Sequence, residues 1–383
     1  MRFEFATTIR IIFGAGTCAE VPVLAVPLGR RAFFVTDSRE RSAPLLDRLS
    51  AQGLSTAVIL VEKEPDLDNI LLALHCYKES GCDLVIGFGG GSALDTGKAV
   101  AALAANLDDP LDYLEIVGAG RALEKPAAPY IAVPTTAGTG SEATRNAVIA
   151  VPEKHIKVSL RSPFMLPRIA VVDPELTYSL PPEITASTGL DALTQVLEPF
   201  VCNAPTPLTD DLCRDGIVRA GRSLLKAFQN GRDVAAREEM SLVSLYGGMA
   251  LANSRLGAVH GMAGPLGGMY PVPHGAVCAR LLPLVMETNL QALRSRQPDS
   301  PAIDHYAEVA RLLTGNPSAR PEEGITHVRK LCEEMAIRQL REFGLRAEDF
   351  PALVSQAQKA SSMKGNPILL TDEEIIHILN DAV

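Results

Sequence analysis

One carboxylate and two imidazoles in this sequence are candidates for binding a divalent metal ion. Asp191 and Gln195 are four residues apart, so on a helix they share one face. His260 and His274 follow in glycine-rich surroundings, each directly before a glycine. One carboxylate and two imidazoles can hold an ion, leave a position open for substrate, and so polarise an alcohol or carbonyl oxygen. Asp191, His260 and His274 are therefore candidate catalytic residues, although a single histidine is more often structural.

A glycine-rich turn, GFGGGS at residues 87–92, could bind phosphate. It lies between an apolar run and a helical pattern. Glycine lets the backbone approach a ligand closely, and a helix N-terminus offers free N–H groups and a positive dipole end. The expected ligand is a pyrophosphate. The spacing is not GxGxxG, so a strand-to-helix turn without a ligand remains the alternative.

Two further features point to a dinucleotide. Asp37 ends the first strand of the alternating region, where a carboxylate can accept ribose hydroxyls and repel a 2′-phosphate, which favours NAD over NADP. A solvated turn aspartate is the alternative. The loop PTTAGTGSE at residues 134–142 also follows a strand, and its small hydroxyl residues could line a cofactor channel or form a simple turn. Loops after parallel strands converge at one sheet edge.

The elements that must position these residues divide the chain in two. Up to about residue 180, β-branched runs alternate with helical stretches, which predicts a parallel sheet with helices on both faces. Residues 3–13 are expected to form an extended strand pair. After Pro181 and Pro182 the pattern becomes helical. We predict an α/β, Rossmann-like dinucleotide-binding domain over residues 1–180 and an all-helical metal and substrate domain over residues 181–383.

The expected strands and helices are as follows. Strands are predicted at 31–37, 55–61, 83–87, 129–134 and 169–173, with helices at 44–52, 66–80 and 93–105. In the second half, helices are predicted at 186–196, 207–228, 234–252, 303–313, 322–336 and 372–380.

Composition excludes several classes of protein. The 383 residues are 47% hydrophobic, which argues against disorder, and their net charge of -9 argues against nucleic acid or anionic membranes as partners. There is no apolar run of about 18 residues that would predict a transmembrane helix, and the N-terminus does not resemble a signal peptide. Seven scattered cysteines without a CxxC motif predict a reducing cytoplasm. None stands at a proposed ligand position, so all are expected to be packing residues.

Four motifs together resemble the iron-containing (group III) alcohol dehydrogenase family. They are GGGSALDTGK at 89–98, PTTAGTGSE at 134–142, DPELT at 173–177 and TGLDALTQVLE at 188–198. The resemblance implies a dehydroquinate synthase-like architecture, a metal-bearing cleft between two domains, and a homodimer or higher homo-oligomer. It also implies metal ligands at Asp191, Gln195, His260 and His274. The NAD(P) site implied by the resemblance comprises Asp37, Gly89, Gly90, Gly91, Ser92, Asp95, Thr135, Thr136, Thr139, Lys157 and Leu176.

The sequence departs from the family at two positions. The family usually has histidine where this chain has Gln195 and Gly264. Three alternatives follow for the metal: the Gln195 amide oxygen is the fourth ligand, the other three ligands suffice, as in the related zinc-dependent glycerol dehydrogenases, or the metal is dispensable, as in the related maleylacetate reductases. We expect a retained Fe²⁺ or Zn²⁺. Without an imidazole at Gly264, proton exchange falls to water, a ribose hydroxyl or another side chain.

The implied function is an NAD(H)-dependent oxidoreductase that interconverts a small alcohol and an aldehyde or ketone, with the metal polarising the substrate oxygen. One alternative is a metal-independent reductase of the maleylacetate type. Another is a dehydroquinate synthase-like lyase, which is disfavoured because residues 259–274 contain no Lys or Arg. The third is a non-catalytic dinucleotide-binding member. The N-terminal strand pair could join the sheet edge of another subunit.

Overall fold

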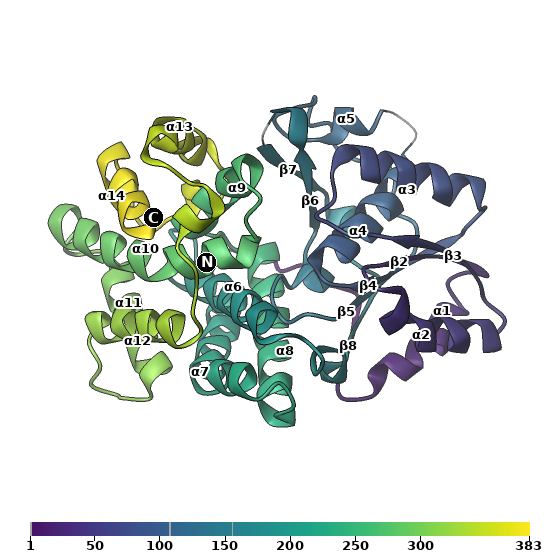
Figure 1. The fold of residues 1–383 in the computed structure, drawn as a ribbon, viewed down its shortest axis with the longest axis horizontal. Helices are drawn as coiled ribbons and strands as arrows, with labels where there is room; N and C mark the ends of the chain where they lie inside the picture. Colours follow the sequence, from purple (N-terminus) through teal and green to yellow (C-terminus); the bar gives the residue numbers. More distant parts are fainter. Residues whose placement is uncertain (1, 107–108, 155) are drawn as a thin grey trace. The chain divides into compact units, whose positions relative to one another are not determined.

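The computed structural model describes residues 2–106, 109–154 and 156–383. The chain divides into two compact units (Figure 1). The sheet unit comprises Ala6–Thr136 and Gly140–Thr177. The helical unit comprises the N-terminal residues up to Phe5, Ala137–Thr139 and Tyr178–Val383. The loop at residues 134–142 thus contributes to both units.

Six parallel strands form the core of the sheet unit, in the order β1-β8-β5-β4-β2-β3. The strands are β1 (Arg10–Phe13), β2 (Arg31–Thr36), β3 (Ser55–Leu60), β4 (Leu84–Gly89), β5 (Tyr130–Pro134) and β8 (Ile169–Val172). From β2 the chain continues to β3 on one side, and from β4 it continues to β5 on the other. The topological switch point, where ligands bind in such sheets, therefore lies between β2 and β4.

Helices cover both faces of this sheet (Figure 1). They are α1 (Val21–Ala25), α2 (Arg39–Ala51), α3 (Leu67–Glu79), α4 (Gly91–Ala105) and the short α5 (Pro110–Tyr113). Side chains alternate across β2, so that Phe34 packs in the cluster with α1 and α2, whereas Phe33 and Val35 pack with α3 and α4. Burial on both faces explains why these strands read as continuous apolar runs, and the predicted α/β class is confirmed.

Two parts of the sheet unit differ from the sequence prediction. An antiparallel pair, β6 (Asn146–Val151) and β7 (Ile156–Arg161), was not expected. The expected strand pair at residues 3–13 is wrong, because only β1 forms there, and it pairs with β8 in parallel. The residues up to Phe5 belong to the helical unit instead.

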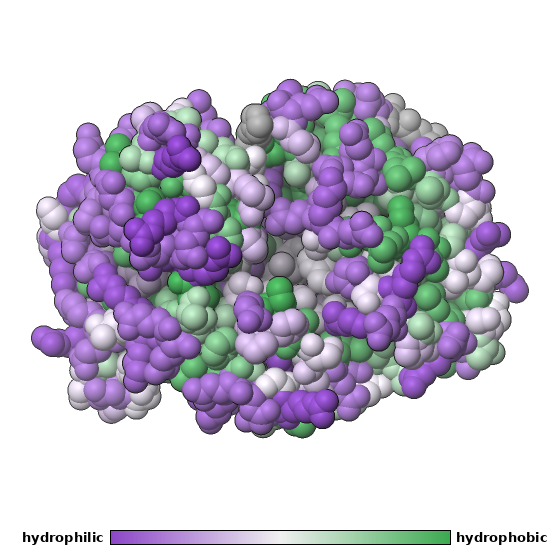
Figure 2. Space-filling model, viewed as in Figure 1, coloured by the Kyte–Doolittle hydropathy of each residue, from purple (hydrophilic) through white to green (hydrophobic). Residues whose placement is uncertain are grey.

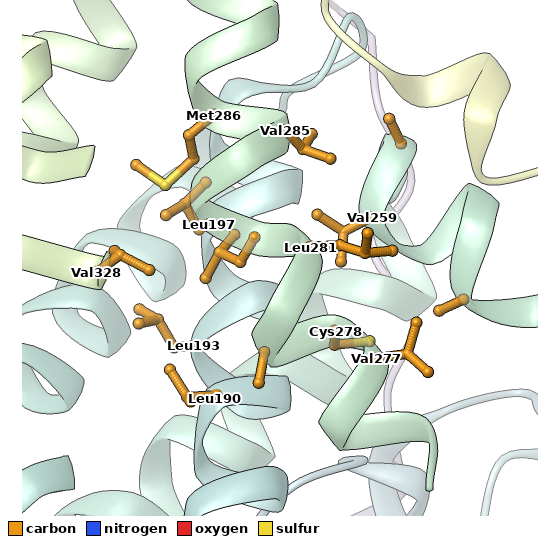
Figure 3. Packing of buried hydrophobic residues seen from close by; sticks show 14 of the residues in the cluster. Leu190, Leu193, Leu197, Val259, Val277, Cys278, Leu281, Val285, Met286 and Val328 are labelled. Atoms are coloured by element: carbon orange, nitrogen blue, oxygen red, sulfur yellow. The ribbon is translucent and has the colours of Figure 1, made fainter. Parts of the chain in front are cut away.

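The helical unit contains nine helices among its described residues. They are α6 (Pro182–Val201), α7 (Pro207–Gln229), α8 (Val234–Asn253), α9 (Ala258–Met269), α10 (His274–Arg296), α11 (Pro301–Thr314), α12 (Pro321–Glu334), α13 (Phe350–Lys359) and α14 (Asp372–Ala382). Leu190, Leu193 and Leu197 of α6 pack in one apolar cluster with Leu281 and Val285 of α10 (Figure 3). These spacings of three and four residues place each set on one helix face, which holds α6 against α10.

Short 3₁₀ helices complete the chain at Thr17–Glu20, Ser141–Ala143, Pro152–Lys154, Pro163–Met165, Pro174–Thr177, Leu340–Phe343, Ala347–Asp349 and Met363–Gly365. On the face shown in Figure 2, hydrophilic residues are interspersed with smaller apolar areas. Within the described ranges, no helix combines the length and apolar character needed to cross a membrane.

Candidate metal and nucleotide sites

Four side chains that can bind a metal ion lie together in the helical unit. They are Asp191 of α6, His260 of α9, and His274 and Cys278 of α10, and one ligand atom of each lies within 4.8 Å of all the others. Asp191 Oδ1 is 3.4 Å from His260 Nε2 and 3.9 Å from His274 Nε2. Cys278 Sγ is 3.9 Å and 3.6 Å from the same two nitrogens. The structure therefore brings the three predicted residues together and adds Cys278.

Cys278, which was expected to be a packing residue, is part of the apolar core and also lies among the potential metal ligands. It stands four residues after His274, so on α10 the two side chains share one face. The N-terminus of α10 can approach α6 because residue 275 is glycine. A Cβ atom at Gly275 would lie 2.4 Å from the carbonyl oxygen of Ser187. Backbone contact between the two helices thus sets the position of both α10 side chains, His274 and Cys278.

Glu198 orients His260, a role that the sequence analysis did not assign. One carboxylate oxygen, Oε2, lies 2.7 Å from His260 Nδ1, and the other, Oε1, accepts a hydrogen bond from the backbone N–H of Val259 at 2.7 Å. Such outer carboxylates fix the tautomer and ring orientation of metal-binding histidines. Glu198 is seven residues after Asp191, two turns along α6, and that spacing was the signal available in the sequence.

Burial and close contacts shift the pKa values of this cluster. Burial raises the pKa of Asp191, but the interactions with His260 and His274 outweigh burial, so the pKa lies below its ordinary value. Burial lowers the pKa of His260, but Cys278, Asp191 and Glu198 raise it well above the usual range. Burial raises the pKa of the Cys278 thiol to about 12.

The chemistry of the four side chains and the surroundings of Asp191 are compatible with a metal ion. Asp191 is 2% exposed, and its Oδ1 has no hydrogen-bond partner among the residues described. A buried carboxylate oxygen without a donor is costly, and a cation facing two imidazoles and a thiol removes that cost. A carboxylate, imidazoles and a sulfur are all ligands that Zn²⁺ and Fe²⁺ accept.

The two positions that depart from the family differ in their surroundings. Gln195 is buried, and its Nε2 donates to the carbonyl oxygen of Gly138 at 2.9 Å and to Asp191 Oδ2 at 3.4 Å. Its role as a metal ligand remains a prediction. Gly264 lies within α9, and a Cβ atom there would meet nothing within 4 Å. Space for a side chain is therefore available at Gly264.

In the sheet unit, the predicted nucleotide residues flank the switch point. Asp37 follows β2 and Gly90 follows β4, and Asp37 Oδ2 accepts a hydrogen bond from the Gly90 N–H at 2.7 Å. Asp37 Oδ1 is buried without a partner among the described residues. A Cβ atom at Gly89 would lie 2.7 Å from Asp37 Oδ2, so only glycine allows this approach. Gly91 and Ser92 form the first turn of α4, with Gly90 as its N-cap.

The loop after β5 meets the glycine turn, as expected for loops at one sheet edge. The Thr135 N–H donates to the carbonyl oxygen of Gly89 at 2.9 Å, and a Cβ atom at Gly90 would lie 3.3 Å from the Thr136 methyl group. The Thr135 hydroxyl is buried without a partner among the described residues. Arg41 donates to the carbonyl oxygens of Thr135 at 3.3 Å and Leu176 at 3.0 Å. These contacts tie Leu176 to the same edge.

Three other predicted nucleotide residues are placed differently. Both oxygens of Asp95 are engaged within the fold, one by the Ser141 hydroxyl at 2.5 Å and one by the Val148 N–H at 2.9 Å. Lys157 forms an ion pair with Glu64. Thr139 belongs to the helical unit.

Two buried ionisable residues, Lys98 of α4 and Glu142, lie near the end of the loop at residues 134–142. Lys98 Nζ donates to the carbonyl oxygens of Ser141 at 2.7 Å and Asn146 at 2.8 Å, and to the Thr144 hydroxyl at 2.8 Å. Burial lowers the pKa of Lys98 to about 8. Burial raises the pKa of Glu142 to about 7, and its Oε1 has no hydrogen-bond partner among the described residues.

A parallel α/β sheet, and a helical unit that groups four potential metal ligands, are the features of the dehydroquinate synthase-like architecture. Residues 8–174 match the profile described as iron-containing alcohol dehydrogenase, and residues 185–383 match the C-terminal profile of the Fe-containing alcohol dehydrogenase family. The chain belongs to the iron-containing alcohol dehydrogenase family, which confirms the predicted resemblance. It is an alcohol and aldehyde oxidoreductase.

Individual relatives agree with this assignment. Alcohol dehydrogenase 4 of Saccharomyces cerevisiae (strain YJM789) is 37% identical over 325 residues, which are 83% of this chain and 82% of the relative. The crystal structure of a 1,3-propanediol oxidoreductase matches with a TM-score of 0.92 and 32% identity over 100% of both chains. Sulfoacetaldehyde reductase of Bifidobacterium kashiwanohense, solved with NAD⁺, matches with a TM-score of 0.87 and 28% identity over 100% of this chain and 99% of its own.

Proposed function

We propose that this enzyme uses NAD(H) to interconvert a small alcohol and its aldehyde or ketone at a divalent metal held by Asp191, His260 and His274. The observation that carries the proposal is the buried Asp191 Oδ1, which faces two imidazole nitrogens at 3.4 and 3.9 Å and accepts no well-aligned hydrogen bond from the described residues. A bound divalent ion supplies Lewis acidity, which polarises the oxygen of the substrate. Fe²⁺ and Zn²⁺ are both consistent with the three residues.

The surrounding side chains position and shield this site. Glu198 holds His260 with Nε2 directed to the cluster, and the backbone N–H of Val259 fixes Glu198 in turn. The His260 side chain is 7% exposed, whereas that of His274 is 33% exposed. Substrate therefore approaches from the side of His274. With glycine at position 264, the alcohol proton is exchanged with water, a ribose hydroxyl or another side chain.

In the nucleotide site, Asp37 Oδ1 accepts a ribose hydroxyl, and the carboxylate repels a 2′-phosphate, so that NAD is favoured over NADP. The free N–H groups at the start of α4 bind the pyrophosphate next to Gly90 and Gly91. The NAD⁺ complex of the sulfoacetaldehyde reductase supports this choice of cofactor. Thr135 and Thr136 line the same edge of the sheet.

Purified enzyme loaded with Zn²⁺ or Fe²⁺ tests the proposal by spectrophotometric turnover of NAD(H) with a panel of alcohols, aldehydes and ketones. Asp191→Asn should remove both the metal and the turnover. Glu322→Gln, at an exposed ion pair with Arg294, is the control that should retain both. Metal-loaded protein that turns over none of the panel would overturn the proposal. Tight NAD binding with neither bound metal nor turnover would favour the non-catalytic alternative.

We also propose a cytoplasmic enzyme that forms a homodimer or a higher homo-oligomer. The unpaired edge of β1 supports association, because an open strand edge can pair with another chain. The absence of a CxxC motif among seven cysteines supports a reducing compartment. Analytical ultracentrifugation tests the first statement, and fractionation of the source cells tests the second.

A further inference from the structure

We infer that Cys278 is the fourth protein ligand of the metal and takes the place of the histidine that the family usually has where this chain has Gln195. This inference rests on the proposed function, because it concerns the metal of the same site. The starting observation is the position of the sulfur. Cys278 Sγ lies 3.6 Å from His274 Nε2 and 3.9 Å from His260 Nε2, although the side chain belongs to a largely apolar cluster (Figure 3).

The distances between these atoms match the edges of a coordination shell. For bonds of about 2.1 Å to nitrogen or oxygen and about 2.3 Å to sulfur, ligand atoms at tetrahedral angles are roughly 3.4 to 3.8 Å apart, and the substrate oxygen would be a fifth ligand. The observed separations to His260 and His274 run from 3.4 to 3.9 Å. All four ligand atoms fall within 4.8 Å of one another, so one ion can reach them together. Asp191 Oδ1, the oxygen facing both imidazoles, has no other partner among the described residues.

Gln195 has a different task in this arrangement. Its amide nitrogen donates to Asp191 Oδ2 at 3.4 Å and to the carbonyl oxygen of Gly138 at 2.9 Å. An amide nitrogen that donates hydrogen bonds has no lone pair for a cation. With its Nε2 facing the Asp191 carboxylate, we assign Gln195 as a positioning residue that holds Oδ2, so that Oδ1 is directed to the ion.

A thiolate changes the chemistry of the site. Sulfur is a soft ligand that favours Zn²⁺ over hard cations such as Mg²⁺. The carboxylate of Asp191 and the thiolate of Cys278 together neutralise the two positive charges of the ion, whereas one carboxylate with imidazoles leaves one charge uncompensated. The ion enters as M²⁺, the sulfur–metal bond forms, and the thiol proton is released to solvent. We therefore expect a zinc-selective site of lower net charge.

Cobalt substitution reads this bond directly. Metal-free enzyme titrated with Co²⁺ should bind one ion per chain and develop the near-ultraviolet charge-transfer absorption of a cobalt–thiolate bond. Cys278→Ala should lose that absorption and weaken Zn²⁺ binding by at least about 100-fold, the upper end of the loss caused by an outer partner. Cys213→Ala, at a fully buried cysteine that is not among the four potential metal ligands, is the matched control and should keep both.

Two further measurements keep the test independent of folding and of turnover. X-ray absorption of the wild-type zinc enzyme should show one sulfur at about 2.3 Å, whether or not Cys278→Ala folds. Stoichiometric metal without a sulfur neighbour, or no bound metal at all, overturns the inference. NAD-linked turnover measured on the same samples then decides the proposed function separately. Turnover without a sulfur–metal bond refutes only the inference, and a sulfur–metal bond without turnover refutes only the proposed function.

Discussion

Replacing Glu198 by glutamine tests how the fold prepares His260 for a metal. The substitution conserves volume and changes one oxygen into an NH₂ group. In the native site both oxygens act as acceptors, Oε2 for His260 Nδ1 and Oε1 for the Val259 N–H. An amide has only one acceptor oxygen, so it cannot serve both donors.

Either orientation of the new amide weakens metal binding. If its oxygen stays on the Val259 N–H, the NH₂ group faces His260 Nδ1. The ring proton must then move to Nε2, the nitrogen that faces the cluster. If the oxygen turns to Nδ1, the buried N–H of Val259 loses its acceptor, at a cost of about 1–3 kcal/mol. Metal affinity should therefore fall roughly 10- to 100-fold, which corresponds to about 1.4–2.7 kcal/mol.

The assay is competition for Zn²⁺ against a chelator of known affinity, with urea unfolding of the metal-free proteins in parallel. The metal-free variant should lose less unfolding free energy than it loses in metal binding, because its imidazole is free to change tautomer. Glu322→Gln, at an exposed ion pair, is the control. Unchanged zinc affinity in Glu198→Gln would refute this reasoning. Equal losses in both measurements would show that Glu198 acts only as a cap for α9.

Three further predictions concern the cofactor, the helices and pH. Asp37→Asn keeps an acceptor for the glycine turn but loses its negative charge, which repels a 2′-phosphate. In steady-state assays the ratio of kcat/KM with NAD to kcat/KM with NADP should therefore fall about tenfold, and an unchanged ratio would contradict this prediction. Gly264→Ala, in open space within α9, should raise the free energy of unfolding in urea by about 0.5–1 kcal/mol. Gly275→Ala, whose Cβ would lie 2.4 Å from the Ser187 carbonyl oxygen, should lower the free energy of unfolding by about 1–3 kcal/mol. Changes of the same sign in Gly264→Ala and Gly275→Ala would be inconsistent with this packing. The raised pKa of Glu142, about 7 against 4.5, means that the folded protein holds this proton more tightly than the unfolded chain, so stability should fall as pH rises between these values. Urea unfolding across this range should show a shallower fall for Glu142→Gln, and an equal slope would argue against the assignment.

Local sequence patterns were sufficient to predict the sheet unit in outline. Apolar runs fully buried on both faces of β2 and β4, separated by helical stretches, can hardly form anything other than a parallel α/β sheet. The pairing of β6 with β7 could not be predicted in the same way. Both strands are mixed in burial, and their pairing depends on contacts with the rest of the unit.

The metal site was predictable only as far as its motif residues. Asp191, His260 and His274 stand at positions that match the family, whereas Cys278 and Glu198 become informative only once α6, α9 and α10 meet. A buried cysteine four residues after a histidine is ordinarily a small apolar residue. Cys278 becomes a potential metal ligand only because the carboxylate of Asp191, 87 positions earlier in the chain and on another helix, lies beside it.

The loss of the usual histidine at Gln195 therefore does not by itself imply the loss of the metal. Because position 195 is glutamine, α6 supplies one of the usual ligands, Asp191, where the family has two. That loss supported the non-catalytic and metal-independent alternatives. Around Asp191 Oδ1 there are four potential ligands, because α10 contributes Cys278 beside His274. Gln195 still contributes through the other oxygen of the same carboxylate, to which it donates a hydrogen bond. If the metal were dispensable, the buried Asp191 carboxylate would be held by its contacts with His260, His274 and Gln195 alone, and replacing it by asparagine would leave turnover unchanged.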